Sequence, residues 1–241
     1  MANEILNIHS QTPETRKVKI AADALKNGAV ILYPTDSGFS LGCDLSNKDA
    51  IDRIRMIRRL DRDHQLTFLC RDLANISEFA QVDNIAYRTL KSLIPGPYTF
   101  ILPASKKVPH FAYNPKRNTA GIRVPNNQLI KLLLKEVGNP ILAISAKLED
   151  NISPTTVEII DFFGNQVDLT VTSDTYKFEG ESTVLDLTKP DYEITISPVF
   201  SPFPLRSRFP SSSFLLSFLF LFFFFFFSFL SPPPPSPFPP S

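Results

Sequence analysis

Short apolar runs rich in β-branched and aromatic residues alternate with amphipathic stretches between residues 18 and 187. Runs of the first kind that end at Gly or Pro indicate buried strands, and apolar residues at helical spacing indicate helices. Helices are predicted over 18–27, 47–60, 84–94, 127–137 and 154–163, and strands over 29–33, 66–70, 98–102, 119–124, 141–145, 167–172 and 183–187. This alternation is typical of one α/β (mixed α+β) domain with a twisted, partly parallel sheet.

The last 45 residues, 197–241, differ from the rest because 14 Phe, 11 Ser, 11 Pro and 6 Leu make up nearly all of them. One interpretation is a C-terminal membrane anchor, since 214–230 are uncharged and reach the lower limit of a spanning length. The other is translated pyrimidine-rich non-coding sequence, because these four amino acids share codons that begin with two pyrimidines. The monotony favours a gene-model artefact, so we expect no membrane partner.

The composition of residues 1–196 excludes several classes of protein. Basic and acidic residues number 23 and 24, so no net charge demands a nucleic acid partner. Two cysteines, Cys43 and Cys70, are too few for a disulfide-rich secreted scaffold. The start of the chain, which carries Glu4 and Glu14, has no secretory or transit pattern. We therefore expect a cytoplasmic protein, or an organellar one if the N-terminus is incomplete.

Common cofactor motifs are missing from the sequence. It contains neither GxGxxG nor GxxxxGK[ST], so it has no Rossmann or Walker nucleotide signature. It contains no HExxH and no CxxC, and its three histidines, His9, His64 and His110, lie far apart in the chain. We predict no metal site formed by the protein itself.

Four segments place polar groups at the ends of predicted strands or on one helix: 34–38, 53–62, 145–147 and 181–188. Ligands of open α/β sheets bind at strand ends, and hydroxyls, backbone N–H groups and guanidinium groups suit phosphate or carboxylate. Each segment also has a plain structural explanation, as a turn, a solvated helix face, the start of a loop or an edge strand. Taken singly, none of these segments distinguishes a ligand-binding site from a plain structural role.

Taken in order along the chain, the segments resemble the YrdC-like proteins, and most closely their YciO branch. The resemblance covers about residues 5–194, which we predict to be one YrdC-like domain with a large twisted mixed sheet flanked by helices. The matching segments are Pro34-Thr35-Asp36, the arginine-bearing helix, Pro95-Gly96-Pro97-Tyr98-Thr99, Gly121-Ile122-Arg123-Val124-Pro125, Ser145-Ala146, Ser153-Pro154-Thr155-Thr156 and Ser182-Thr183-Val184-Leu185-Asp186-Leu187.

The resemblance implies an activity related to L-threonylcarbamoyladenylate synthase. Such enzymes use ATP, L-threonine and bicarbonate, release pyrophosphate, and supply a nucleotidyltransferase step of tRNA modification. A carboxylate oxygen of the carbamoylated threonine attacks the α-phosphate, and positioning and charge neutralisation provide most of the catalysis in such transfers. Mg²⁺ would be expected on the triphosphate of ATP.

The resemblance also suggests a substrate-binding set. Thr35 would contact threonine, Arg123 would hold a carboxylate, and Arg58 stands at the first position of the family's phosphate-binding KxR motif. Ser145 opens the family's SxN motif, in which Lys147 replaces the Asn, and Ser182 and Thr183 would lie against the phosphates or the carbamate. We name no catalytic residue.

This sequence departs from the synthase pattern at several positions. The final Arg of KxR is Leu60, the family's loop Tyr is Phe39, and the proline-leucine pair after KxR reads Gln65-Leu66. Ile194-Thr195-Ile196-Ser197 stands where the family has an Arg-x-Gly segment. Loss of a phosphate-contacting Arg typically costs a few kcal/mol in the transition state, so we expect weak or altered activity.

The alternative is a non-catalytic module that binds tRNA or double-stranded RNA. Its proposed contacts are Arg53, Arg55, Arg59 and Arg62 on the predicted helix, supported by Lys106, Lys107, Lys116 and Arg117. Binding through phosphate contacts would weaken steeply with salt.

Overall fold

The structure is a computed structural model of the 241-residue chain and describes residues 4–114, 116–148, 154–173, 181–189 and 193–195. The helices among these residues are α1 (Thr15–Lys26), α2 (Lys48–Ile57), α3 (Leu73–Phe79), α4 (Asn84–Leu93), α5 (Gln128–Val137) and α6 (Thr156–Gly164). The strands are β1 (Glu4–Ile8), β2 (Ile31–Thr35), β3 (Gly38–Asp44), β4 (Thr67–Leu69), β5 (Tyr98–Pro103), β6 (Thr119–Arg123), β7 (Ile141–Ser145), β8 (Leu169–Ser173), β9 (Thr183–Asp186) and β10 (Glu193–Thr195).

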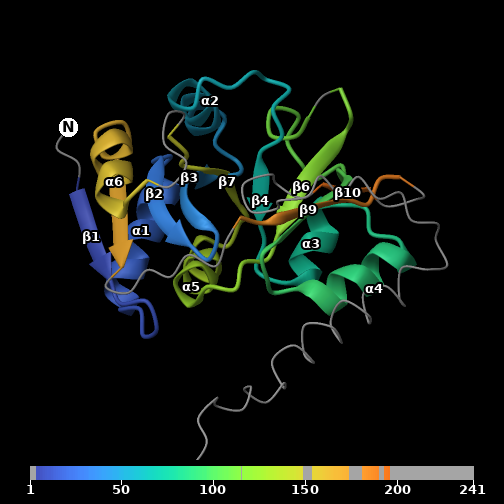
Figure 1. The fold of residues 1–241 in the computed structure, drawn as a ribbon, viewed down its shortest axis with the longest axis horizontal. Helices are drawn as coiled ribbons and strands as arrows, with labels where there is room; N and C mark the ends of the chain where they lie inside the picture. The colour runs from blue at the N-terminus through green and yellow to red at the C-terminus, as the bar shows by residue number, and fades with distance from the viewer. Residues whose placement is uncertain (1–3, 115, 149–153, 174–180, 190–192, 196–241) are drawn as a thin grey trace, which may run out of the picture. The chain divides into compact units, whose positions relative to one another are not determined.

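All ten strands form one mixed sheet in the order β1-β8-β2-β3-β7-β4-β6-β5-β9-β10. The pairs β1–β8, β8–β2, β4–β6 and β5–β9 are parallel and the other neighbours are antiparallel. Strands far apart in the sequence therefore lie side by side, as β1 and the orange strand β8 do in Figure 1. The predicted α/β class and the mixed, helix-flanked sheet are confirmed.

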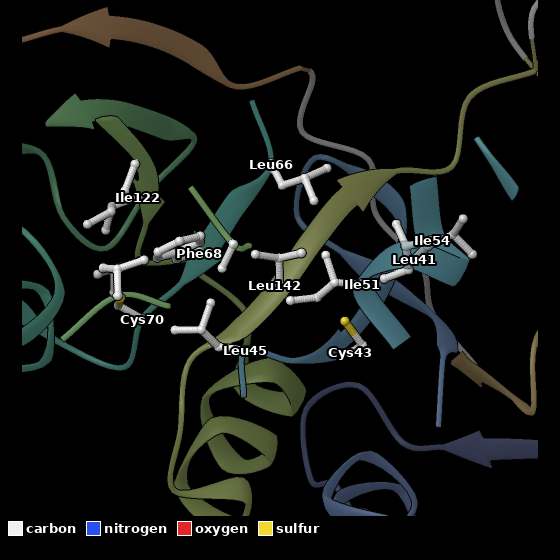
Figure 2. Close-up of a cluster of buried hydrophobic side chains, with 14 of the residues drawn as sticks. Leu41, Cys43, Leu45, Ile51, Ile54, Leu66, Phe68, Cys70, Ile122 and Leu142 are labelled. Atoms are coloured by element: carbon white, nitrogen blue, oxygen red, sulfur yellow. The ribbon is translucent and has the colours of Figure 1, made fainter. Parts of the chain in front are cut away.

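The core is divided into two clusters because successive strand side chains point to opposite faces of a sheet. On β2, Ile31 and Tyr33 join a cluster that includes the buried face of α1 and α5. The intervening Leu32 joins the other cluster, which includes the buried residues of α2 and α6. Figure 2 shows that cluster around Leu41, Ile51, Phe68 and Leu142.

Both cysteines are free thiols inside the protein. Cys43 and Cys70 are completely buried, and both belong to the cluster in Figure 2. Burial raises the pKa of each thiol well above its usual value because the thiolate would lose its hydration. Neither is a reactive nucleophile at neutral pH.

Three strands and one helix were not predicted: β1, β3, β10 and α3. Strand β3 lies between the predicted strand 29–33 and the predicted helix 47–60, where the sequence indicates a loop. Gly42 is required for packing, because a Cβ there would lie 2.6 Å from a ring carbon of Tyr33. Gly38 has a φ of 118°, which fits the turn between β2 and β3.

The spacing of Ser46 and Asp49 in the sequence is typical of a capping box, but Ser46 is not the N-cap of α2. Asn47 is the N-cap, and its side-chain oxygen accepts a hydrogen bond from the Ala50 N–H at 2.9 Å. Ser46 donates to Asp44 instead, through both its N–H and its hydroxyl. Asn and Ser are comparable N-caps, so residue type does not explain why Asn47, and not Ser46, caps α2. The residue at which the helix begins explains it.

The predicted anchor or artefact at 197–241, like Ser153 of the family-like segment, lies outside the described residues. Among the helices that the structure does describe, none is both long enough and apolar enough to cross a membrane.

Candidate functional site

Four of the seven predicted substrate-binding residues lie around one small hollow. They are Thr35, Arg123, Ser145 and Ser182, which come from β2, β6, β7 and the residue just before β9. The complete lining of this small hollow is Thr35, Ser37, Ser40, Thr67, Leu69, Thr99, Arg123, Pro125, Ala143, Ile144, Ser145 and Ser182. Its volume of about 40 Å³ holds a carboxylate or a single phosphate group, because it has room for only a few water-sized atoms.

The strand register explains why these residues converge. Ser40 pairs with Ser145, and Thr67 pairs with Ala143, so their side chains share one face of the sheet. Thr99 on β5 contributes the next hydroxyl, which lies 3.0 Å from the hydroxyl of Ser182. Hydroxyl groups from β2, β3, β4, β5, β7 and the residue before β9 thus line the small hollow.

Arg123 is the one charged side chain in the small hollow, and it is 5% exposed. Its Nη2 lies 2.7 Å from Oδ1 of Asp36, an ion pair without the alignment of a hydrogen bond. Its Nη1 donates to the hydroxyl of Ser37. Its Nε and Nη2 have no hydrogen-bond acceptor among the described residues. A buried guanidinium with unused N–H groups suits an anionic ligand, since a carboxylate accepts two parallel N–H bonds.

Asp36 acts as the counter-ion of Arg123 and links three segments. Its side chain is 2% exposed, and Oδ2 accepts a hydrogen bond from the Asn126 N–H at 3.2 Å. It lies in the two-residue turn that joins β2 and β3, where the Thr35 hydroxyl donates to the Gly38 carbonyl at 2.7 Å. The turn, the end of β6 and the start of α5 are therefore held together at the small hollow.

The other three predicted substrate-binding residues lie outside the lining of the small hollow. Arg58 Nη1 donates to the Lys147 carbonyl at 2.5 Å, and its guanidinium lies 5.8 Å from the centre of the Phe163 ring. Lys147 forms an ion pair with Glu181, and the Thr183 N–H donates to the Pro97 carbonyl. These contacts tie α2, the end of β7 and the segment before β9 together beside the small hollow.

The arginines of α2 and of the loop after it have different surroundings. Arg53 binds both carboxylate oxygens of Asp168, at 2.8 and 2.6 Å. Arg55 is 8% exposed and donates to the Phe111 carbonyl at 3.1 Å. Arg59 and Arg62 are exposed and have no ion-pair partner within the described ranges. Leu60, which replaces the last Arg of the KxR motif, packs against the core.

Sequence reasoning missed several residues of the site: Asp36 as a counter-ion, and Ser37, Ser40, Thr67 and Thr99 as hydroxyls of the small hollow. Ser40 is also the centre of a GxSxG match at 38–42, a spelling typical of nucleophile elbows. Here all five residues lie within one strand, β3, without the strand-to-helix turn that such an elbow requires. The lining of the small hollow includes no histidine, so we assign Ser40 no nucleophilic role.

The chemistry of the small hollow suits an anion better than a cation. Its lining contains the guanidinium of Arg123 and no carboxylate, and the neighbouring carboxylate of Asp36 is already paired with Arg123. In the described part of the chain, no three His, Cys, Asp or Glu side chains come together as metal ligands would. A Mg²⁺ ion that arrived with a nucleotide would thus depend on the phosphates and water for its ligands.

Known proteins share the sequence and the fold of this chain. Residues 23–196 match the family model Sua5_yciO_yrdC, described as telomere recombination. The uncharacterized protein YciO of Escherichia coli is 40% identical over 188 residues, which cover 77% of this chain and 91% of YciO. The crystal structure of E. coli YciO has a TM-score of 0.76 at 38% identity and covers 81% of this chain and 95% of its own.

Two further relatives have a named activity or a bound ligand. The threonylcarbamoyl-AMP synthase of Vibrio vulnificus is 32% identical over 148 residues, which cover 60% of this chain and 79% of that protein. The crystal structure of P. abyssi Sua5 complexed with L-threonine has a TM-score of 0.72 at 26% identity, and covers 79% of this chain and 56% of that one. The chain belongs to the Sua5/YciO/YrdC family, in its YciO branch, and is related to the threonylcarbamoyl-AMP synthases.

Proposed function

We propose that this protein binds a small carboxylic acid, with L-threonine as the first candidate, by placing its carboxylate in the small hollow, and activates it with ATP. The observation that carries the proposal is the buried guanidinium of Arg123, which lines the small hollow and whose Nε has no hydrogen-bond acceptor in the part of the chain described. An unmatched buried N–H costs about 1–3 kcal/mol, and a carboxylate would remove that cost. Likeness to the threonine complex of Sua5 supports the choice of acid.

The surrounding hydroxyls would complete recognition of the acid. Thr35 and Ser37 lie on one side of Arg123, and the paired hydroxyls of Thr99 and Ser182 also line the small hollow. A hydroxyl donates one hydrogen bond and accepts others, so these groups suit the carboxylate and hydroxyl of threonine equally well. Thr183 follows Ser182 at the start of β9, and we propose that it lies near the phosphates of the nucleotide.

The reaction we propose is adenylyl transfer. The amine of threonine and bicarbonate give a carbamate and water, and a carboxylate oxygen of the carbamate then attacks the α-phosphorus of ATP. The new bond joins that oxygen to phosphorus, the bond from the α-phosphorus to the bridging oxygen breaks, and pyrophosphate leaves. Charge neutralisation by Arg123, and by Arg58 and Lys147 once ATP lies beside them, would lower the barrier.

The nucleotide would lie mostly outside the small hollow, which is too small for it. Arg58 and Lys147 currently hold other protein groups, so phosphate binding would have to displace the Lys147–Glu181 ion pair. Mg²⁺ bound to the triphosphate would supply further charge neutralisation. Competition from Glu181, together with Leu60 in place of an Arg, predicts slow turnover.

The test is pyrophosphate release from ATP and bicarbonate in the presence of threonine or other small amino and hydroxy acids. We expect release with at least one acid, and a loss of about tenfold in Ser182→Ala, equivalent to one lost hydrogen bond. Ser92→Ala, which removes an exposed hydroxyl on α4, is the matched control and should behave as wild type. Absence of release with every acid, together with unchanged threonine binding in Ser182→Ala, would refute the proposal.

RNA binding is a second candidate function, supported by the exposed Arg59 and Arg62 just beyond α2. If they contact phosphates, Arg59→Ala with Arg62→Ala should weaken binding of a tRNA and reduce its salt dependence by about two counterions. Lys107 and Lys116 already pair with Glu78 and Asp63, so we expect less from them. Affinity that does not change between low and moderate salt would exclude this function.

A further inference from the structure

A second, larger hollow is lined by Asp36, the ion-pair partner of Arg123, and shares Pro125 with the small hollow. It is enclosed by the β2–β3 turn, the start of α3, the loop before β5 and the start of α5, and its volume is about 720 Å³. Cavities of about 300–1,000 Å³ are typical of small-molecule sites. Asp36 lines the large hollow, whereas Thr35, Arg123 and Ser182 line only the small one, so the two are separate sites that share Pro125.

The charged groups of the large hollow favour an anion. Arg71 and Lys131 both line it. The Arg71 Nε donates to Asp72 at 3.2 Å, whereas the side chain of Lys131 has no hydrogen-bond or ion-pair partner in the described portion of the chain. The two lining carboxylates already have partners: Asp36 pairs with Arg123, and Asp72 accepts the Asn75 N–H at 2.8 Å as the N-cap of α3. Hydrogen bonds to its carboxylate lower the pKa of Asp72, so this group is ionised at neutral pH and already has partners within the protein.

The remaining lining suits an organic molecule rather than a bare ion. Ile94 directly after α4, Val124 directly after β6, and Leu134 on α5 provide apolar surface. The side chains of Asn126 and Gln128 add carboxamides near Lys131, at the end of the helix where backbone N–H groups favour negative charge. Apolar walls with a few polar groups are the usual composition of a small-molecule site.

We infer that the large hollow is a second ligand site for a small organic anion of about mononucleotide size. Its phosphate or carboxylate group contacts Arg71 and Lys131, and its apolar body lies on Ile94, Val124 and Leu134. This site is independent of the proposed function, because it shares none of the hydroxyls of the small hollow and none of the free N–H groups of Arg123.

The test is an NMR titration of the full chain with AMP, inorganic phosphate and succinate, with uncharged adenosine as the control ligand. AMP or succinate should shift the amide signals of residues 126–131 and of Arg71. A shift with AMP and phosphate but not succinate identifies a phosphate ligand, and the reverse identifies a carboxylate. Lys131→Ala should raise Kd about tenfold, because it removes a charged donor.

The matched control is Lys135→Ala, which removes an exposed lysine from the same helix, one turn beyond Lys131 and not among the lining residues of the large hollow. Its Kd should equal that of the wild type, and Ser182→Ala should likewise leave these shifts unchanged. The inference is overturned if millimolar AMP, phosphate and succinate all leave the amides of 126–131 unshifted. It is also overturned if adenosine shifts them as strongly, or if Lys135→Ala weakens binding as much as Lys131→Ala.

Discussion

Two regions of this protein use arginine in opposite ways. The segment 53–62, in α2 and the loop after it, is dense in arginine, and its Arg53, Arg55 and Arg58 bind protein groups: Asp168, the Phe111 carbonyl and the Lys147 carbonyl. The end of β6 has only Arg123, which lies in a hollow of hydroxyls and keeps N–H groups without acceptors in the described structure. A high density of charge in the sequence is therefore a poor guide to which cation receives a ligand.

The difference follows from geometry. An exposed helix lets long side chains reach neighbouring carboxylates and carbonyls, and such pairs contribute little free energy each. A guanidinium at a buried strand end cannot turn to solvent, so its charge must be neutralised on the spot, here by Asp36. The fixed position that results is what a substrate-binding cation requires. The following predictions test this contrast between Arg123 and the arginines of 53–62.

The largest effect is expected for Asp36→Asn, which leaves Arg123 buried without its counter-ion. Breaking a buried pair costs about 3–5 kcal/mol, so the free energy of unfolding should fall by that amount. Urea denaturation would measure it. The carboxamide introduced by this substitution retains an oxygen for the Asn126 N–H, so the loss would report mainly on charge.

The double variant Asp36→Asn with Arg123→Met is the control for this prediction. Because it removes both buried charges, most of the lost stability should return while binding of the acid is abolished. Equal stability of wild type and Asp36→Asn would show that Arg123 does not depend on this carboxylate.

A smaller effect is expected for Arg55→Ala. This side chain is buried within α2, and the substitution removes both its packing and the donor to the Phe111 carbonyl. The free energy of unfolding should fall by about 1–3 kcal/mol. Arg55→Met, which keeps the packing, should lose less, and a larger loss in Arg55→Met than in Arg55→Ala would contradict this explanation.

Arg53→Ala should cost about 1 kcal/mol or less, since Arg53 and Asp168 are both more than one third exposed. Added salt should reduce the difference from wild type, because it screens exposed pairs. Thermal melts at two salt concentrations would show this. Arg62→Ala is the control without an ion pair in the described ranges, and it should change stability by less than about 0.5 kcal/mol.

Most of the sheet could be predicted because its strands are apolar runs with clear ends, such as 98–102 and 141–145. Strand β3 was missed because Gly42 reads locally as a loop residue, while its cause is the Tyr33 ring on the neighbouring strand. The grouping of Thr35, Arg123, Ser145 and Ser182 came from the family resemblance. The role of Asp36 was missed since it depends on the end of β6 approaching the β2–β3 turn, which no local pattern records.

The smallest effect concerns Asp52, whose pKa is lowered chiefly because the Lys48 ammonium donates a hydrogen bond to it at 2.7 Å. A carboxyl group with a lowered folded pKa stabilises the protein fully above its unfolded value of 3.8, and that contribution is lost as the pH falls further. Asp52→Asn should therefore be slightly less stable at neutral pH and lose less stability than wild type below pH 3.8. Urea denaturation across this acid range measures the difference. If the free energies of unfolding of wild type and Asp52→Asn change with pH in parallel, the Lys48–Asp52 pair contributes nothing to stability. The contrast with the buried Arg123 would then depend on Arg53 and Arg55 alone. If added salt abolishes the difference, the Lys48–Asp52 pair is screened as the exposed Arg53–Asp168 pair is, and unlike the buried Asp36–Arg123 pair.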